Sequence, residues 1–183
     1  MIYSLEKNIM TNKNRSAEIY KKAEAIADVF NHGFEEIIKR PEWAEYFYKI
    51  TPENKKRVRE EVLSFTSHAL TVLLRMNGYI QNLEDVETFM GHFVSQVGGW
   101  NDSLFKRIEE YRAIDRERED ALSSAAQLCF ARHLSSVLLG TESEDGEVLL
   151  SLSDLGTLFL MNFITPALTE AFYNRARREG RKW

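Results

Sequence analysis

Apolar residues recur at helical spacing along most of the chain, and this pattern predicts an all-helical protein. Over residues 13–40 they fall at every third or fourth position until Pro41, which cannot continue a hydrogen-bonded helix and is expected to open a short one. A long helix is expected over residues 52–76, because Thr51 offers a capping oxygen directly before Pro52. Its apolar stripe is broad, so one face of this helix is expected to be buried.

Further amphipathic segments follow, each bounded by residues that stop or cap a helix. Residues 84–97 end at Gly98 and Gly99, and residues 102–139 form either one bent helix or two. The last helix is expected to begin at a cap formed by Ser153 and Asp154 and to kink or restart at Pro166. The pattern predicts about seven or eight helices in one domain over residues 13–179, with residues 1–12 as an extension and 180–183 as a tail.

Composition narrows the function classes. The chain has 183 residues, 44% of them hydrophobic, which suits one core, and its net charge of -4 argues against a general affinity for nucleic acid. A basic run near the end, residues 175–182, is interpreted as the cationic end of a helix. The lone Cys129 excludes an intramolecular disulfide, and no stretch is read as long enough to span a membrane. We therefore expect a cytoplasmic protein without a membrane partner.

Four positions share a spacing that carries a family likeness. Pro41 opens the short helix, Phe47 lies six residues on, His68 lies 21 residues further, and Val72 follows one turn later. This set resembles the globin family, in which a Pro starts the third helix, a Phe packs on haem, and a distal His precedes an aliphatic residue. The fragments PEWAEYF and HALTVLL also look like invertebrate intracellular globins, and the resemblance covers about residues 15–100.

The resemblance implies a globin-like fold and a haem protein that binds or senses a diatomic gas such as oxygen. Phe47 would stack on the macrocycle, and Val72 would line the distal pocket. His68 would donate a hydrogen bond to iron-bound oxygen or coordinate the iron itself. Asn101 stands where the family places its axial histidine, and an amide is a poor iron ligand. His92 is therefore the candidate axial ligand, provided that the connection over residues 77–82 is tight.

Asn101 also supports an alternative of another class. In that alternative the chain is a haem-free globin-fold module that acts through protein contacts, with a homodimer among the forms that such contacts could take. An unrelated helical interaction bundle is a third hypothesis. No phosphate loop, zinc spacing or nucleophile elbow is found, and Cys129 is expected to pack in the core, so the sequence does not predict an enzyme.

Overall fold

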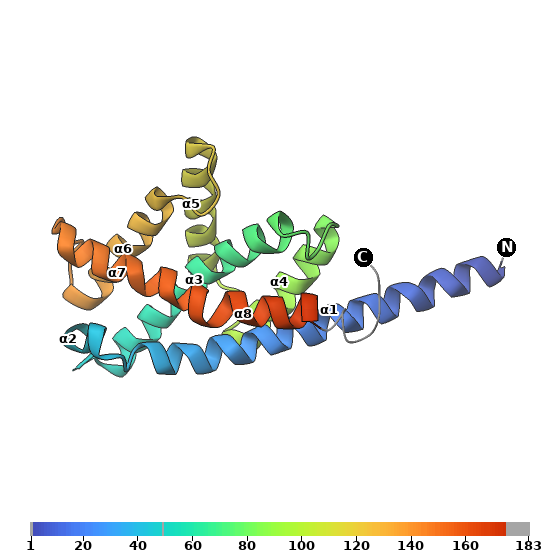
Figure 1. Ribbon diagram of the computed structural model, residues 1–183, viewed down its shortest axis with the longest axis horizontal. Helices are drawn as coiled ribbons and strands as arrows, with labels where there is room; N and C mark the ends of the chain where they lie inside the picture. Colours follow the sequence, from blue (N-terminus) through green and yellow to red (C-terminus); the bar gives the residue numbers. More distant parts are fainter. Residues whose placement is uncertain (1, 49, 175–183) are drawn as a thin grey trace.

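The longest helix, α1 (Ile2–Ile37), forms one side of the molecule, and later helices pack along it (Figure 1). The computed structural model describes residues 2–48 and 50–174, with the side chains of 14–48 and 50–173. This part consists of seven helical segments in one domain and contains no strand. The all-α prediction is confirmed, whereas the globin-type arrangement stays a prediction.

The first half of the fold follows the start and stop residues of the sequence. A 3-10 turn, η1 (Pro41–Trp43), leads into the short helix α2 (Ala44–Phe47). Helix α3 (Pro52–Met76) begins where Thr51 Oγ1 accepts the N–H of Asn54 at 3.2 Å, so the predicted cap is confirmed. Helix α4 (Leu83–Val97) packs along α1 and ends at the predicted glycine pair.

The second half of the fold builds on α3. Helix α5 (Asp102–Arg118) and helix α6 (Ser124–Leu139) both pack against α3, and α6 also packs against α7 (Gly146–Phe159). The segment over residues 102–139, left open as one helix or two, is therefore two helices. The last helix continues from α7 through η2 (Leu160–Ile164), α8 (Thr165–Leu168) and η3 (Thr169–Asn174), antiparallel to α1 (Figure 1).

The start of the last helix differs from the prediction, whereas the disturbance near Pro166 is confirmed. The predicted cap at Ser153 and Asp154 is wrong because both residues lie inside α7. Asp145 caps the helix instead, and its carboxylate accepts the N–H of Glu147 at 2.9 Å. Segment η2 has π-helical hydrogen bonding directly before Pro166, which has no N–H to donate.

The helix Gly146–Tyr173 is also long and apolar enough to cross a membrane by length and composition alone. This finding corrects the expectation that no stretch reaches such a length, because Asp154 is the only charged residue between Val148 and Thr169. About 39% of its most apolar window is buried inside the protein, and core helices of soluble proteins pass the same test. The finding therefore assigns no location. The predicted basic run over residues 175–182 and the tail at 180–183 lie outside the described residues.

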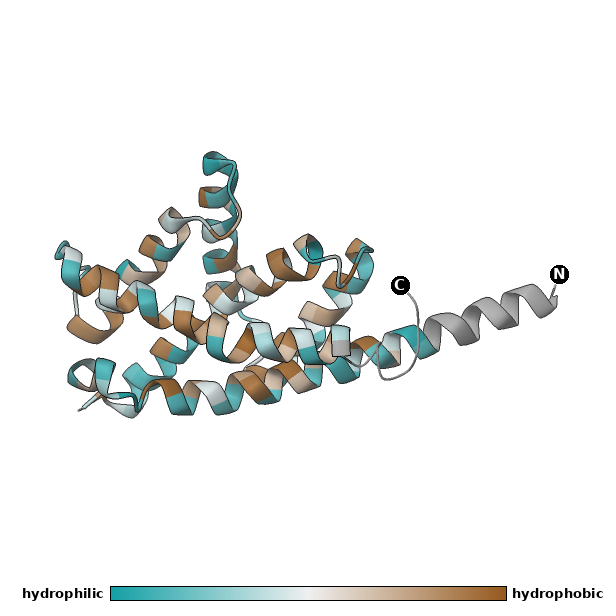
Figure 2. Cartoon of the chain, viewed as in Figure 1, coloured by the Kyte–Doolittle hydropathy of each residue, from teal (hydrophilic) through white to brown (hydrophobic). Residues whose placement is uncertain are grey.

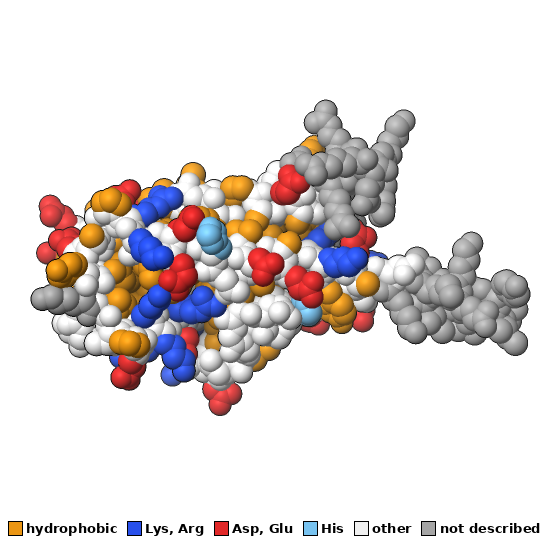
Figure 3. Space-filling view, turned by 90° about the horizontal axis from the view of Figure 1, so that it is seen from below, with side chains coloured by type: hydrophobic (Ala, Val, Ile, Leu, Met, Phe, Trp, Pro, Cys, Tyr) orange, Lys and Arg blue, Asp and Glu red, His pale blue; other side chains and the backbone are white. Residues whose placement is uncertain are grey.

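Aromatic side chains hold the core together. Phe30 of α1 meets Phe93 of α4 and Phe159 of α7, with ring centroids 6.0 and 5.4 Å apart. Phe65 of α3 stacks on Phe130 of α6 at 4.7 Å. Apolar residues face the inside of the bundle, while the free end of α5 is hydrophilic (Figure 2). On the face seen in Figure 3, basic side chains gather toward the α2 end but are mixed with acidic ones.

Candidate functional site

A cleft of about 1430 Å³ opens between the C-terminal half of α3, the start of α4 and helix α5. Helix α3 packs against both α4 and α5, while α5 leans away from the α3–α4 hairpin (Figure 1). The inner part of the cleft contains His68 and Val72 of α3 together with Val86 and Met90 of α4. The cleft is thus a groove with one helix as its floor and two as its walls.

The rim of the cleft carries large apolar side chains that are exposed to solvent. These are Met76 (70% exposed), Leu83 (58%), Trp100 (48%) and Phe105 (57%). A single exposed apolar residue is common on soluble proteins, but several around one opening form a patch of the kind that marks a binding surface. Covering this patch would remove apolar area from water, which is favourable.

Charged side chains around the cleft are mostly acidic. The acids are Glu87, Glu109, Asp115, Glu119 and Asp120, and the bases are Arg75, Arg112 and Arg116. Glu109 forms an ion pair with Arg112. Glu87 and Glu119 are exposed and have no cationic partner within the described part of the chain. The opening therefore favours a ligand that brings positive charge.

A buried pair of polar residues lies at the floor of the cleft. His68 Nε2 donates to Asp115 Oδ2 at 2.7 Å, and the same carboxylate accepts the N–H groups of Leu122 and Ser123 and the Ser123 hydroxyl. Burial opposes ionisation of Asp115, but hydrogen bonds from Ser123 and His68 outweigh it and lower the pKa of this carboxyl. Burial lowers the pKa of His68 despite the nearby Asp115. The pair therefore consists of the neutral imidazole of His68 and the ionised carboxylate of Asp115.

The Asp115 carboxylate also explains why the chain breaks between α5 and α6. Glu119 and Leu122 have φ values of +51° and +57°, a left-handed conformation that is unfavourable for residues with a side chain. The hydrogen bonds from Leu122 and Ser123 to Asp115 hold this turn in place. The break thus depends on the same carboxylate that holds His68.

The structure places only part of the predicted haem site at the cleft. His68 and Val72 both line it, one turn apart on α3. Phe47 is buried in the core at the end of α2 and does not line the cleft. Phe47, predicted to stack on haem, therefore does not face the same cavity as His68 and Val72, the predicted distal residues.

His92, the candidate axial ligand, is directed toward α1. Its Nε2 lies 3.1 Å from Glu24 Oε1, and its ring lies 4.7 Å from the ring of Tyr20. Asn101, at the position of the expected axial histidine, is the N-cap of α5, where its Oδ1 accepts the N–H of Leu104 at 2.8 Å. Of the residues predicted around haem, only His68 and Val72 line the cleft, and haem binding stays a prediction from the sequence.

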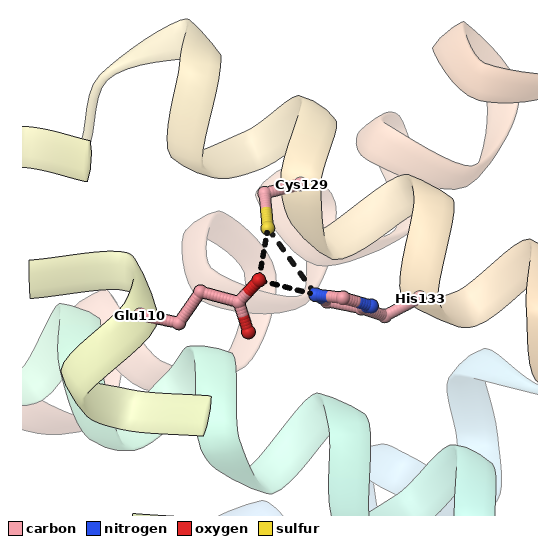
Figure 4. Close-up of side chains that lie close together, drawn as sticks. All are labelled: Glu110, Cys129 and His133. Carbon is pink, nitrogen blue, oxygen red and sulfur yellow. Dashed lines mark hydrogen bonds and ion pairs between the residues drawn. The ribbon is translucent and has the colours of Figure 1, made fainter. Parts of the chain in front are cut away.

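A second group of polar side chains lies between α5 and α6, and sequence reasoning missed it. Glu110, Cys129 and His133 point toward one another (Figure 4). Burial, followed by the charge of Glu110, raises the pKa of Cys129 to about 12, so the thiol is protonated at neutral pH. Cys129 is partly buried and packs against the core, and its thiol also contacts Glu110 and His133, contacts that were not predicted from the sequence. The sequence did contain one signal of this group: Cys129 and His133 are four residues apart, about one helical turn, so their side chains lie on the same face of a helix.

Comparison with protein-family models, curated proteins and solved structures finds no match for this chain. The class that the fold and the cleft define is an all-helical protein with an apolar groove and an acidic rim. The likeness to globins therefore depends on the sequence alone, and the function has to be argued from the geometry of the sites.

Proposed function

We propose that this protein is a helical interaction module whose cleft binds an amphipathic helix of a partner protein. The observation that carries the proposal is the ring of exposed apolar side chains, Met76, Leu83, Trp100 and Phe105, around one groove. The proposal shares its mode of action, protein contacts, with both the haem-free globin-fold alternative and the hypothesis of a helical interaction bundle.

The shape of the cleft favours a helix over a small molecule. An α-helix with its side chains is about 10–12 Å wide, and grooves between helices bind such segments through apolar anchors at i, i+3, i+4 and i+7. Pockets for small molecules usually measure about 300–1000 Å³. The cleft, at about 1430 Å³ and open along its rim, exceeds this range. An elongated apolar segment would fill it better.

The charge of the rim specifies the flanks of the partner helix. Glu87, Glu119 and Asp120 are exposed acids of the cleft. They outnumber Arg75, the exposed base of its lining without an ion pair among the described residues, since Arg112 and Arg116 both approach Glu109. Lysine or arginine residues beside the apolar stripe of the partner would therefore meet complementary charge. Such complementarity speeds association and selects the partner more than it adds affinity.

A synthetic peptide tests this function directly. The probe is a helical peptide with leucines at i, i+3, i+4 and i+7 and with lysines along both flanks of that stripe. Trp100 lies on the rim and reports binding through its fluorescence, whereas Trp43 is buried away from the cleft. We expect a saturable blue shift that is absent in a Trp100→Phe variant. A scrambled peptide of the same composition should bind much more weakly.

Two substitutions provide the matched comparison. Phe105→Asp should weaken peptide binding about tenfold, because it removes an exposed aromatic contact of about 1–2 kcal/mol and places a charge against the apolar stripe of the peptide. Leu150→Asp changes an apolar residue on α7 that is also exposed but does not line the cleft, and it should leave binding unchanged. Equal binding of the scrambled peptide, or no effect of Phe105→Asp, would rule the proposal out. A dimer of the protein that dissociates on Phe105→Asp would instead place a second copy in the cleft.

A further inference from the structure

Three electron-rich atoms converge between α5 and α6, away from the cleft (Figure 4). Glu110 Oε1 lies 3.1 Å from His133 Nε2, and Cys129 Sγ lies 3.3 Å from His133 Nε2. The distance from Cys129 Sγ to Glu110 Oε1 is 3.5 Å. An oxygen, a nitrogen and a sulfur atom thus form a small triangle in which each atom carries lone pairs.

Arg107 determines which atoms donate and which accept hydrogen bonds around this triangle. Its Nη1 lies 2.7 Å from His133 Nε2 and 2.8 Å from Glu110 Oε2. A guanidinium can only donate, so His133 Nε2 accepts from it and then faces the acceptor Glu110 Oε1 without a proton between them. Two lone-pair atoms, His133 Nε2 and Glu110 Oε1, therefore face one another at 3.1 Å.

We propose that Glu110, Cys129 and His133 form a binding site for a zinc ion. Zinc binds carboxylate oxygen, imidazole nitrogen and thiolate sulfur at about 2.0–2.3 Å in tetrahedral geometry, which separates the ligand atoms by about 3.3–3.6 Å. The three observed distances, 3.1, 3.3 and 3.5 Å, differ from these edges by a few tenths of an ångström. The ligand atoms are therefore already near the spacing that the ion requires.

Charge also favours a divalent cation at this position. The carboxylates of Glu61 and Glu110 and the guanidinium of Arg107 leave one net negative charge in the partly buried cluster. When the zinc–sulfur bond forms, the thiol proton of Cys129 passes to water. The ion and the new thiolate together add one positive charge, which brings the cluster to neutrality.

The neighbours of the triangle provide an outer shell that keeps the ligands in place. Zinc would take the lone pair of His133 Nε2, so Arg107 Nη1 would give up its 2.7 Å contact with that nitrogen and keep its hydrogen bond to Glu110 Oε2. Glu110 would give Oε1 to zinc, and Arg107 Nη2 also donates to Glu61 Oε1 at 3.2 Å. Such hydrogen bonds to a ligating carboxylate are common around metal sites. A water molecule would complete the tetrahedron as the fourth ligand.

Cobalt and zinc titrations of the full chain under reducing conditions test the proposal. Co²⁺ replaces zinc at tetrahedral sites, and its bond to a thiolate gives a sulfur-to-metal charge-transfer band in the near ultraviolet. Because Cys129 is the only cysteine of the chain, this band reports this site alone. We expect one equivalent of Co²⁺ to produce the band and one equivalent of Zn²⁺ to remove it. Absence of the band in the folded wild-type protein would overturn the proposal without any variant.

Variants assign the remaining ligands. Cys129→Ser should abolish the band, and His133→Gln should lower zinc affinity at least about tenfold in competition with a chromogenic chelator. His32→Gln is the matched control, because His32 lies exposed on α1, where its Nε2 is 2.9 Å from Glu36 Oε1, away from the triangle. Circular dichroism confirms that each variant is folded. Zinc affinity that His133→Gln leaves unchanged in the folded protein would show that the metal binds elsewhere.

Discussion

Helix α5 contacts two histidines in very different ways. Toward its C-terminal end, Asp115 holds His68 through one short hydrogen bond of 2.7 Å in a buried position. Nearer its middle, Arg107 and Glu110 both approach Nε2 of His133, at 2.7 and 3.1 Å. In the first region the Asp115 carboxylate accepts four hydrogen bonds, although His68 Nδ1 is buried without a partner among the described residues. In the second region Glu110 Oε1, Cys129 Sγ and His133 Nε2 lie within 3.5 Å of one another. A fully hydrogen-bonded buried carboxylate organises the backbone, whereas converging lone pairs suit a cation.

The region around Asp115 and His68 shapes the backbone, whereas the region around His133 does not. Asp115 accepts four hydrogen bonds, from His68, from Leu122 and from both donors of Ser123. It therefore fixes the turn between α5 and α6 and closes the floor of the cleft. The cluster around His133 is only partly buried and joins side chains without holding any backbone N–H in a turn.

Removal of the Asp115 carboxylate should have the largest effect on stability. Asp115→Ala leaves the buried Nε2–H of His68 and the N–H groups of Leu122 and Ser123 without their acceptor. We expect the free energy of unfolding to fall by about 3–5 kcal/mol, as for other buried charged networks that lose one member. Urea denaturation at neutral pH measures this change.

The control for this substitution is Asp120→Ala. Asp120 is exposed, and its Oδ1 accepts only the N–H of the adjacent Ala121, so the expected loss is below about 0.5 kcal/mol. A loss below about 1 kcal/mol for Asp115→Ala would show that the turn does not need the carboxylate. Asp115 would then organise the backbone no more than the cluster around His133 does.

Acid should destabilise the protein through the same pair. Burial lowers the pKa of His68, and hydrogen bonds that outweigh burial lower the pKa of Asp115. For both groups the unfolded chain takes up the proton first. Stability from His68 is therefore complete above about pH 6.5 and is lost as the pH falls below it, and that from Asp115 is lost below about pH 4.

The measurement is the free energy of unfolding between pH 7 and pH 5. We expect it to fall as the pH is lowered, with a slope of at most about 1.4 kcal/mol per pH unit for one proton. His68→Gln should flatten this slope, and the exposed His32→Gln should not. A stability that rises toward pH 5 would contradict a buried neutral His68.

The parts of the fold that the sequence could predict are those set by local contacts. Thr51 caps α3 through an N–H only three residues away, so the residues at the cap were enough to predict it. The predicted start of the last helix at Ser153 and Asp154 was wrong because Asp145, eight residues before Ser153, has the same capping chemistry and is followed by apolar residues. Where two local signals compete, packing against α6 decides which one starts the helix.

The sites depend on contacts that no local pattern contains. The partner of His68 is Asp115, which lies 47 residues later in a segment rich in charged residues. The spacing of Cys129 and His133 was visible, but the carboxylate of Glu110 joins them only because α5 packs on α6. His92 and Phe47 had suitable spacing for haem, yet helix packing turned each toward other neighbours.

The smallest expected effect concerns Tyr111, which lies between the two regions. Its ring centroid is 5.9 Å from that of His68, and its buried hydroxyl has no hydrogen-bond partner among the described residues. Burial, followed by the charge of Glu61, raises the pKa of this hydroxyl, so it stays protonated. Tyr111→Phe keeps the ring contact with Phe65 and removes an unpaired polar group. We expect the free energy of unfolding to rise by about 0.5–1 kcal/mol.

Tyr79→Phe is the matched control, because the Tyr79 hydroxyl has a partner in Thr169 Oγ1 at 3.4 Å. This variant should lose up to about 1 kcal/mol, and urea denaturation of both variants measures the difference in sign. A loss of similar size for Tyr111→Phe would mean that its hydroxyl is hydrogen-bonded, since only a satisfied group costs stability on removal. The polar cluster around His133 would then continue through Tyr111 toward His68, and the two regions of α5 would act as one network.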